Sequence, residues 1–168
     1  MSDPFKIIEP TVISFSGGRT SAYMLWRVLQ SNNGLPDDAI VCFANTGKEE
    51  EATLKFVHDC EVNWNVPIHW VEYSVDDPKF KKVTFETASR NGEPFESLII
   101  NKKYLPNPVT RYCSIELKIR TISKYCKSIG LDCGEFRLPI QKMTSSSMDA
   151  FKNDLQKLKF SGFCSSLG

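Results

Sequence analysis

Three short apolar runs separated by two helical patterns constrain the fold of this chain most strongly. Residues 11–15, 39–44 and 68–73 have the length and the β-branched content of buried strands. The stretches between them carry apolar residues every three or four positions, which is the spacing of one helix face. The order strand, helix, strand, helix, strand predicts an α/β fold with a mainly parallel sheet and right-handed crossovers.

The helical patterns also predict which side chains are buried. The first helix begins near Ser21, and we expect its Trp26 in the core rather than stacked on an adenine ring. The first helix has the apolar face Ala22, Leu25, Trp26 and Leu29, and the second has Thr53, Phe56, Val57, Cys60 and Trp64. A third amphipathic helix is expected from Cys113 to Gly130, with the apolar face Ile115, Ile119, Ile122, Cys126 and Ile129.

The stretch from Asp76 to Leu105 has a looser pattern. A short extended run is expected at residues 83–85 and a brief apolar segment at 95–100, so we interpret the stretch as an insertion over the sheet. Its basic residues could supply cations to a substrate: Lys79, Lys81, Lys82 and Arg90.

Length and composition narrow the class of protein. The 168 residues, 41% of them hydrophobic, suffice for one domain with a proper core. The 21 basic and 20 acidic residues leave no global field, so nucleic acid is not indicated as a partner. No run is long enough for a membrane span and the first residues lack the regions of a signal peptide, so we expect a cytoplasmic protein without membrane contact.

Cysteines and histidines give little support for a metal site. No two cysteines form a CxxC pair, and in a cytoplasmic protein we expect all six to be reduced: Cys42, Cys60, Cys113, Cys126, Cys133 and Cys164. His58 and His69 have no partner at ligand or triad spacing, so structural roles are favoured. The acidic run 49–51 fits a solvated first turn of a helix better than a metal site.

Two polar turns are expected at one rim of the sheet. Residues 16–21, Ser-Gly-Gly-Arg-Thr-Ser, join the first strand to the first helix, and Asn45-Thr46-Gly47 follows the second strand. Glycines allow a tight turn with outward N–H groups, and the helix adds the positive end of its dipole. Ligands of parallel sheets lie beyond the carboxyl ends of the strands. The pattern therefore predicts an anion site.

A third polar stretch opens the last helix. Arg111, Ser114 and Lys118 are spaced by three and four, so they could line one side of its entrance and bind an anion. Cys113 near that helix N-terminus could be a nucleophile with a depressed thiol pKa. A buried cysteine under a surface salt bridge explains the same residues equally well.

These three stretches together resemble one family. Residues 16–21 are similar to the PP-loop of adenine-nucleotide α-hydrolase-like proteins, and Asn45-Thr46-Gly47 resembles the Asp-Thr-Gly turn after their second strand. Arg111-Tyr112-Cys113 with Lys118 resembles a segment of the phosphoadenosine phosphosulfate (PAPS) reductase branch. The resemblance covers roughly residues 9 to 130.

The resemblance implies a Rossmann-like three-layer sandwich with a mainly parallel sheet. It implies a PP-loop nucleotide-binding domain over residues 1–135, followed by a diverged or truncated segment, 136–168, rather than a separate domain. It implies Cys113 as the catalytic residue and an adenine nucleotide, PAPS or ATP, as the ligand. The implied nucleotide-binding residues are Ser14, Ser16, Gly17, Gly18, Arg19, Thr20, Ser21, Asn45, Thr46, Gly47, Arg111 and Lys118.

The family has two chemistries. One branch cleaves ATP between its α and β phosphates with Mg²⁺; the reductase branch attacks the sulfur of PAPS with a cysteine thiolate that a thioredoxin-like partner regenerates. Thr20 stands where the motif has an aspartate, so reductase-like chemistry is favoured and a role for Mg²⁺ stays open. No metal ligand set and no permanently bound cofactor is expected.

Departures from the family limit the claim of catalysis. The nearest matches to the reductases' Glu-Cys-Gly-type motif are Asp132-Cys133-Gly134 and Phe163-Cys164-Ser165. Cys113 is followed by Ser114 rather than by a second cysteine, which disfavours an iron–sulfur cluster. Two hypotheses stay open: an enzyme acting on an adenine nucleotide, or a non-catalytic nucleotide-binding protein or modification-complex subunit. Self-association into a homo-oligomer is also left open.

Overall fold

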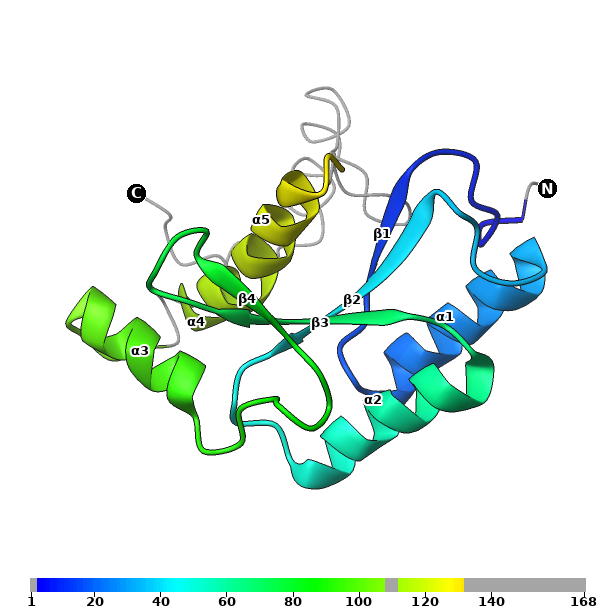
Figure 1. The fold of residues 1–168 in the computed structure, drawn as a ribbon. Coiled ribbons are helices and arrows are strands. Elements are labelled where there is room, and N and C mark those ends of the chain that lie inside the picture. The colour runs from blue at the N-terminus through cyan, green and yellow to red at the C-terminus, as the bar shows by residue number, and fades with distance from the viewer. Residues whose placement is uncertain (1–2, 108–111, 132–168) are drawn as a thin grey trace, which may run out of the picture. The chain divides into compact units, whose positions relative to one another are not determined.

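A four-stranded open sheet forms the centre of the computed structural model, which describes residues 3–107 and 112–131 (Figure 1). Its order is β1-β2-β3-β4, with β1, β2 and β3 parallel and β4 antiparallel to β3. The strands are β1 (Thr11–Ser14), β2 (Ala39–Asn45), β3 (Ile68–Tyr73) and β4 (Phe80–Val83). The mixed α/β class with a mainly parallel sheet, predicted from the apolar runs, is confirmed.

Two helices connect the parallel strands. α1 (Arg19–Asn32) joins β1 to β2, and α2 (Glu51–Trp64) joins β2 to β3. Their buried residues pack with one set of strand side chains in the largest apolar cluster of the described residues. Its fully buried members include Phe15, Leu25, Val41, Phe43, Leu54 and Val57.

A continuous helical stretch packs against the other set of strand side chains. It consists of α4 (Tyr112–Ser114), the π-helix η1 (Ile115–Arg120) and α5 (Thr121–Ser128). Successive residues of a strand point to opposite faces of a sheet, so Val41 and Phe43 belong to the first cluster and their neighbours to the second. The buried members of the second cluster are Cys42, Ala44, Val71, Ile122, Tyr125 and Cys126.

The apolar face predicted for the last helix is only partly right. Ile122 and Cys126 are buried, but Ile115 and Ile119 are 43% and 57% exposed and Ile129 is also exposed. A π-helix closes its hydrogen bonds over five residues, so η1 shifts the side chains out of the 3.6-residue register. The positions that turn inward instead are Tyr112, Glu116, Leu117 and Thr121.

The stretch after β3 is more regular than its sequence predicts. A strand does form here, but at Phe80–Val83, so only Val83 of the extended run expected at residues 83–85 belongs to it. This strand extends the sheet by pairing with β3. The apolar segment at 95–100 lies in a helix, α3 (Glu93–Lys102). The description as an insertion over the sheet is therefore wrong for β4, which is a member of the sheet.

Trp26 is a second correction. Its side chain is 41% exposed and stacks on Tyr23 with the ring centroids 5.9 Å apart. Val28 takes the buried position in α1 beside Ala22 and Leu25. The i, i+3, i+4 spacing predicted the helix and its buried residues Ala22, Leu25 and Leu29, and only Trp26 was misplaced.

Some expectations fall outside the described residues. Arg111, Cys133, Cys164 and the segment 136–168 belong to this group. Within residues 3–107 and 112–131, no helix has the length and apolarity needed to cross a membrane.

Candidate functional site

The glycine turn lies at the carboxyl end of β1, where the sequence predicts it. The Phe15 N–H still donates to the Cys42 carbonyl at 2.8 Å, after which the chain leaves the sheet. Gly17 adopts φ +76°, and a Cβ there would lie 2.8 Å from Thr53 Cγ2 of α2. The turn therefore requires glycine at position 17, for its backbone conformation and for its close approach to α2.

Hydroxyl groups hold the turn in shape. Ser21 Oγ accepts hydrogen bonds from the Ser16 N–H at 3.3 Å and from Ser16 Oγ at 3.0 Å. The same hydroxyl donates to the Gly18 carbonyl at 2.8 Å. Ser16 and Ser21 are thus occupied with the turn itself, and their first role in this structure is to position its backbone.

Backbone donors of the turn are left free for a ligand. Within the described residues, no acceptor pairs with the N–H groups of Gly17, Gly18, Arg19 and Thr20. Gly18 is the N-cap of α1 and makes no side-chain cap, and the first turn of α1 has no acidic residue. Free N–H groups at the positive end of a helix suit an anion. Around them, Ser14, Arg19 and Thr20 are exposed.

Asn45 occupies the second turn but is fully buried. Its Oδ1 accepts a hydrogen bond from the Gly47 N–H at 3.0 Å, and its Nδ2 donates to Glu72 Oε1 at 2.7 Å and to the Ser89 carbonyl at 2.8 Å. All of these contacts are internal to the protein. Asn45 therefore shapes the turn rather than offering its amide to a ligand.

Gly47 is held as tightly as Gly17. It has φ +75°, and a Cβ there would lie 2.7 Å from Pro94 Cδ at the start of α3. Thr46 Oγ1 donates to Glu49 Oε1 at 3.1 Å and accepts from the Lys48 N–H at 3.3 Å. Residues 45–47 thus form a rigid rim next to the first turn of α2.

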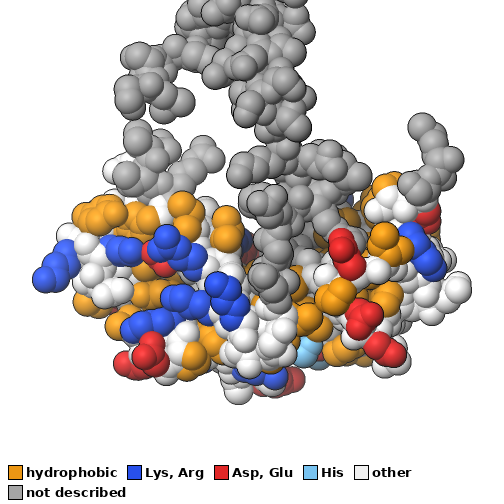
Figure 2. Space-filling view, turned by 90° about the horizontal axis from the view of Figure 1, so that it is seen from above, with side chains coloured by type: hydrophobic (Ala, Val, Ile, Leu, Met, Phe, Trp, Pro, Cys, Tyr) orange, Lys and Arg blue, Asp and Glu red, His pale blue; other side chains and the backbone are white. Residues whose placement is uncertain are grey.

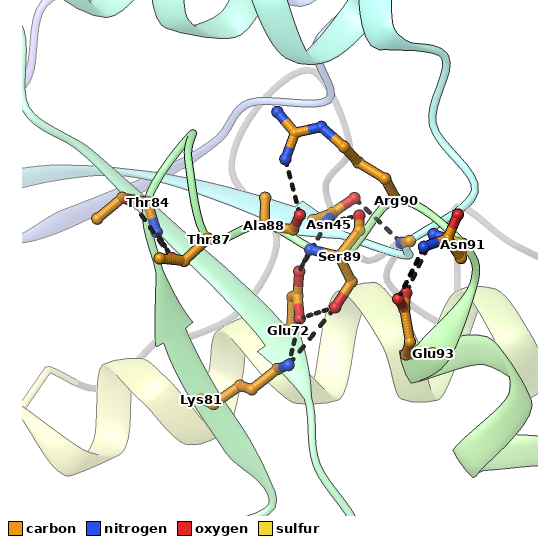
Figure 3. A network of polar contacts seen from close by, with 11 residues as sticks. Asn45, Glu72, Lys81, Thr84, Thr87, Ala88, Ser89, Arg90, Asn91 and Glu93 are labelled. Carbon is orange, nitrogen blue, oxygen red and sulfur yellow. Dashed lines mark hydrogen bonds and ion pairs between the residues drawn. The ribbon is translucent and has the colours of Figure 1, made fainter.

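Glu72 at the end of β3 is the centre of this polar network (Figure 3). It is fully buried and accepts hydrogen bonds from Asn45, from the Ser89 N–H at 2.6 Å and from Ser89 Oγ at 2.8 Å. Lys81 of β4 completes it as an ion pair at 2.8 Å. A buried carboxylate needs such partners. The network thereby fastens the loop around Ser89 to the carboxyl ends of β2 and β3.

Glu72 and Ser89 are not among the site residues predicted from the sequence. A charged residue near the end of an otherwise apolar strand was the available signal for Glu72. Nothing local marks Ser89, because its role depends on how the loop after β4 returns to the sheet.

Lys118 reaches the same rim from η1. Its Nζ lies 3.3 Å from Glu49 Oε1, the carboxylate oxygen to which Thr46 also donates. The structure therefore brings Lys118 to the turn at 45–47, although 69 residues separate Lys118 from Glu49. The glycine turn packs on Thr53 in the first turn of α2, four residues after Glu49.

Cys113 lies on the α3 side of this region. It is half-buried and packs against the apolar cluster of Tyr73, Leu98, Tyr112 and Leu117. Within the described residues its thiol makes no hydrogen bond to either turn. Cys42, Cys60 and Cys113 are free cysteines, and burial raises the pKa of the Cys60 thiol.

The acidic run at the start of α2 is more structured than a solvated first turn. Glu49 pairs with Lys118, and Glu51 pairs with Arg90 at 2.7 Å. The hydrogen bond from Arg90 lowers the pKa of Glu51. Arg90 also donates to the carbonyls of Phe85 and Ala88. Its guanidinium therefore holds the loop in place and is not available to a substrate.

Two of the other loop cations, Lys81 and Lys79, are also used within the protein. Lys81 pairs with Glu72, and Lys79 donates to the Val75 carbonyl. The histidines have aromatic partners: His58 stacks on Phe85 with the centroids 4.6 Å apart, and His69 Nδ1 lies 2.9 Å from the Tyr125 hydroxyl. In the described part of the chain, no three His, Cys, Asp or Glu side chains are grouped so as to hold a metal ion.

Comparison with known proteins finds a relative in a bacteriophage. An uncharacterized nin region protein, ORF290, of Escherichia phage lambda is 33% identical over 128 residues of alignment. The alignment covers 68% of this chain and 42% of the relative, so the chain spans less than half of that protein's length. No protein-family model matches the chain. No solved structure matches it either.

Proposed function

We propose that this chain is a PAPS reductase-like member of the PP-loop superfamily and binds an adenine nucleotide at residues 16–21. The observation that carries this proposal is the set of free backbone N–H groups from Gly17 to Thr20 at the N-terminus of α1. They face the rim where parallel strands end, which is the usual place for a ligand in such a sheet. The phosphate or sulfate end of the nucleotide would bind there.

The surrounding rim supports an anionic ligand. Lys118 is fixed beside the second turn by Glu49, and the exposed Arg19 begins α1. A phosphate group would compete with Glu49 for the Lys118 ammonium. The fold we propose is the Rossmann-like three-layer sandwich of the superfamily, which agrees with one apolar cluster on each face of the sheet.

The chemistry we propose is thiol-dependent reduction of a sulfonucleotide. The Cys113 thiolate attacks the sulfur of PAPS, the bond from that sulfur to the phosphate oxygen breaks, and adenosine bisphosphate leaves with the electron pair. A dithiol protein of the thioredoxin type then attacks the resulting S-sulfocysteine, which releases sulfite, restores Cys113 and leaves the partner as a disulfide. The absence of an acidic residue in the first turn of α1 argues against a Mg²⁺-dependent cleavage of ATP there.

A non-catalytic nucleotide-binding protein is the second candidate, and the environment of Cys113 favours it. The thiol packs on an apolar cluster, and no hydrogen bond within the described residues directs it toward the glycine turn. In that case the site would serve to hold a nucleotide or to complete a larger assembly.

Calorimetry with ATP, AMP, PAPS and adenosine phosphosulfate tests the binding proposal. We expect at least one of the four to bind, and no binding by any of them would overturn both candidates. Sulfite release from PAPS with thioredoxin, abolished in Cys113→Ser at unchanged nucleotide affinity, supports the reductase. Nucleotide binding without sulfite release supports the second candidate.

Lys118 and Glu49 provide a matched pair of variants. Lys118→Ala should weaken nucleotide binding by about 1.5–3 kcal/mol, because a charge-assisted hydrogen bond to phosphate is lost. Glu49→Gln breaks the same ion pair but leaves the Lys118 ammonium available to the ligand. The affinity of this variant for the nucleotide should therefore stay equal or rise. An equal loss of nucleotide affinity in both variants would show that the ion pair only supports the structure of the rim.

A further inference from the structure

The near-zero net charge of this chain conceals an uneven distribution of charged residues. Residues 3–72 contain ten acidic and five basic residues. In residues 97–107 and 112–131, six basic residues face a single acidic one, Glu116. The six are Lys102, Lys103, Lys118, Arg120, Lys124 and Lys127.

A row of these cations runs from Arg120, the last residue of η1, along the exposed side of α5. Arg120, Lys124 and Lys127 are spaced i, i+4 and i+7, so they lie along one side of the helix, while Ile122 and Tyr125 are buried against the sheet. At 1.5 Å per residue the row is about 10 Å long.

Neighbouring elements widen the row into a surface. The Lys82 ammonium of β4 lies 5.7 Å from the ring centroid of Tyr125 in α5. Lys102 at the end of α3 and Arg120 both bind Glu116 Oε1, at 2.8 and 2.7 Å. The resulting basic face consists of Lys82, Lys102, Arg120, Lys124 and Lys127. Figure 2 shows Lys and Arg side chains gathered on the left, the side where α3 and β4 lie in Figure 1.

Within the described residues, only part of the charge of the basic face is neutralised. Its acidic residue, Glu116, is buried beneath Lys102 and Arg120. In the described part of the chain, neither Lys82 nor Lys124 nor Lys127 forms an ion pair. Some cations elsewhere on the surface have such partners, as Lys55 has Asp59 and Arg90 has Glu51.

We propose that the basic face binds the phosphodiester backbone of a nucleic acid. A row of separated cations on a helix surface suits a polymer with evenly spaced charges, whereas a small anion needs donors that converge on one point. A nucleic-acid strand carries one charge per about 3.4 Å, so about three phosphates span the 10 Å row. This proposal does not depend on the nucleotide site, since none of the five residues belongs to that site.

Fluorescence anisotropy with labelled oligonucleotides of about 20 nucleotides tests the proposal on the full chain. Single-stranded RNA, single-stranded DNA and duplex DNA are compared between about 25 and 200 mM KCl. Three phosphate contacts predict a slope of log affinity against log salt of about −2 for a single strand and nearly −3 for a duplex. The three probes decide which nucleic acid is preferred.

Two double variants of equal charge change locate the binding surface. Lys124→Gln with Lys127→Gln should lower the affinity about tenfold at low salt and reduce the slope by more than 1. Lys6→Gln with Lys55→Gln removes the same charge from the first half of the chain and should leave both values unchanged. All four side chains are at least partly exposed, so the fold should persist; Lys82→Gln serves as a single-site replacement if the first variant unfolds.

Three results would overturn the proposal. One is no binding of any oligonucleotide at the lowest salt concentration. Another is an equal loss in both double variants, which would mean diffuse attraction to the whole protein. The third is tighter binding to phosphatidylcholine vesicles containing phosphatidylserine than to any oligonucleotide, which would make the basic face a membrane contact.

Discussion

At the scale of single residues, the pair Asn45 and Glu72 shows why this chain has an amide where the resembled family has an aspartate. Glu72 is fully buried, and its Oε1 lies 2.7 Å from Asn45 Nδ2. An aspartate at position 45 would put two carboxylates in contact in a buried site. The amide instead donates to Glu72 and to the Ser89 carbonyl, which fixes the turn at residues 45–47.

Exchanging these two groups should reveal their coupling. Asn45→Asp should lower the free energy of unfolding by about 3 kcal/mol, because it leaves a buried charge without compensation. Adding Glu72→Gln should restore at least half of that loss, since the new amide can donate to the new carboxylate. Urea unfolding followed by circular dichroism measures both values. Independent, additive losses in the two single variants would mean that the residues do not interact as the structure has them.

His69 should make stability depend on pH. Burial, together with the nearby positive charge of Lys82, lowers the pKa of His69 from its ordinary 6.5. The unfolded chain therefore takes up this proton more readily than the folded protein. The free energy of unfolding should decrease as the pH falls below about 6.5. Above that pH, the neutral His69 makes its full contribution to stability.

Histidine variants isolate this contribution. The free energy of unfolding, measured by urea titration between about pH 5 and 8, should lose part of its pH dependence in His69→Gln. His58→Gln keeps His69 and should retain the slope of the unaltered protein. If the two variants have the same pH dependence, His69 does not supply it.

At the scale of elements, the two adjacent glycines of the first turn have different requirements. Gly17 has φ +76°, and a Cβ there would almost touch Thr53. Gly18 has φ −96°, and the nearest atom to a Cβ at that position would be Ser16 Oγ at 3.9 Å. Only Gly17 has both a backbone conformation that is strained for other residues and a steric barrier.

Alanine at each position should therefore give unequal results. Gly17→Ala should lower the free energy of unfolding by about 2 kcal/mol or more, through the left-handed backbone and the contact with α2. Gly18→Ala should cost less than about 1 kcal/mol, the difference between these residues at an N-cap. Thermal unfolding of both variants provides the comparison. Equal losses would contradict the packing of the turn on α2.

The same scale explains what could be predicted from the sequence. β2, β3 and the two connecting helices follow directly from apolar runs and from the 3.6-residue period, because burial of one face determines them. The last helix also follows from that period, but its buried face follows only in part, because η1 widens the turns before Thr121, whose hydroxyl donates to the Glu116 carbonyl. The π-helix η1 leaves Ile115 and Ile119 exposed, and no local pattern in the sequence predicts a π-helix there.

The candidate site divides in a similar way. Both polar turns could be predicted, since parallel strands bring their carboxyl ends to one rim. The contact of Lys118 with Glu49 and that of Ser89 with Glu72 join segments far apart in the chain. Such contacts depend on how loops return to the sheet, which the residue pattern alone does not contain.

At the scale of the whole described unit, one helical stretch serves two surfaces. Lys118 in η1 points to Glu49 beside the candidate nucleotide site, while Arg120, Lys124 and Lys127 belong to the basic face. Arg120, where the basic face begins, is only two residues from Lys118. Arg120 and Lys102 share Glu116 as their ion-pair partner. The two proposed ligands would bind neighbouring parts of the same stretch without sharing a residue.

Two separate sites should stabilise the protein additively. A saturating adenine nucleotide and a saturating oligonucleotide, each at about 100 times its dissociation constant, should each raise the free energy of unfolding by about 2.7 kcal/mol. Both together should give nearly the sum, because neither ligand displaces the other. About 0.5 M KCl should remove most of the oligonucleotide contribution, which rests on several exposed phosphate contacts, and retain more of the nucleotide contribution. Urea unfolding under the four ligand conditions at both salt concentrations measures these terms, and a second ligand that adds nothing to the first would mean that both occupy one site.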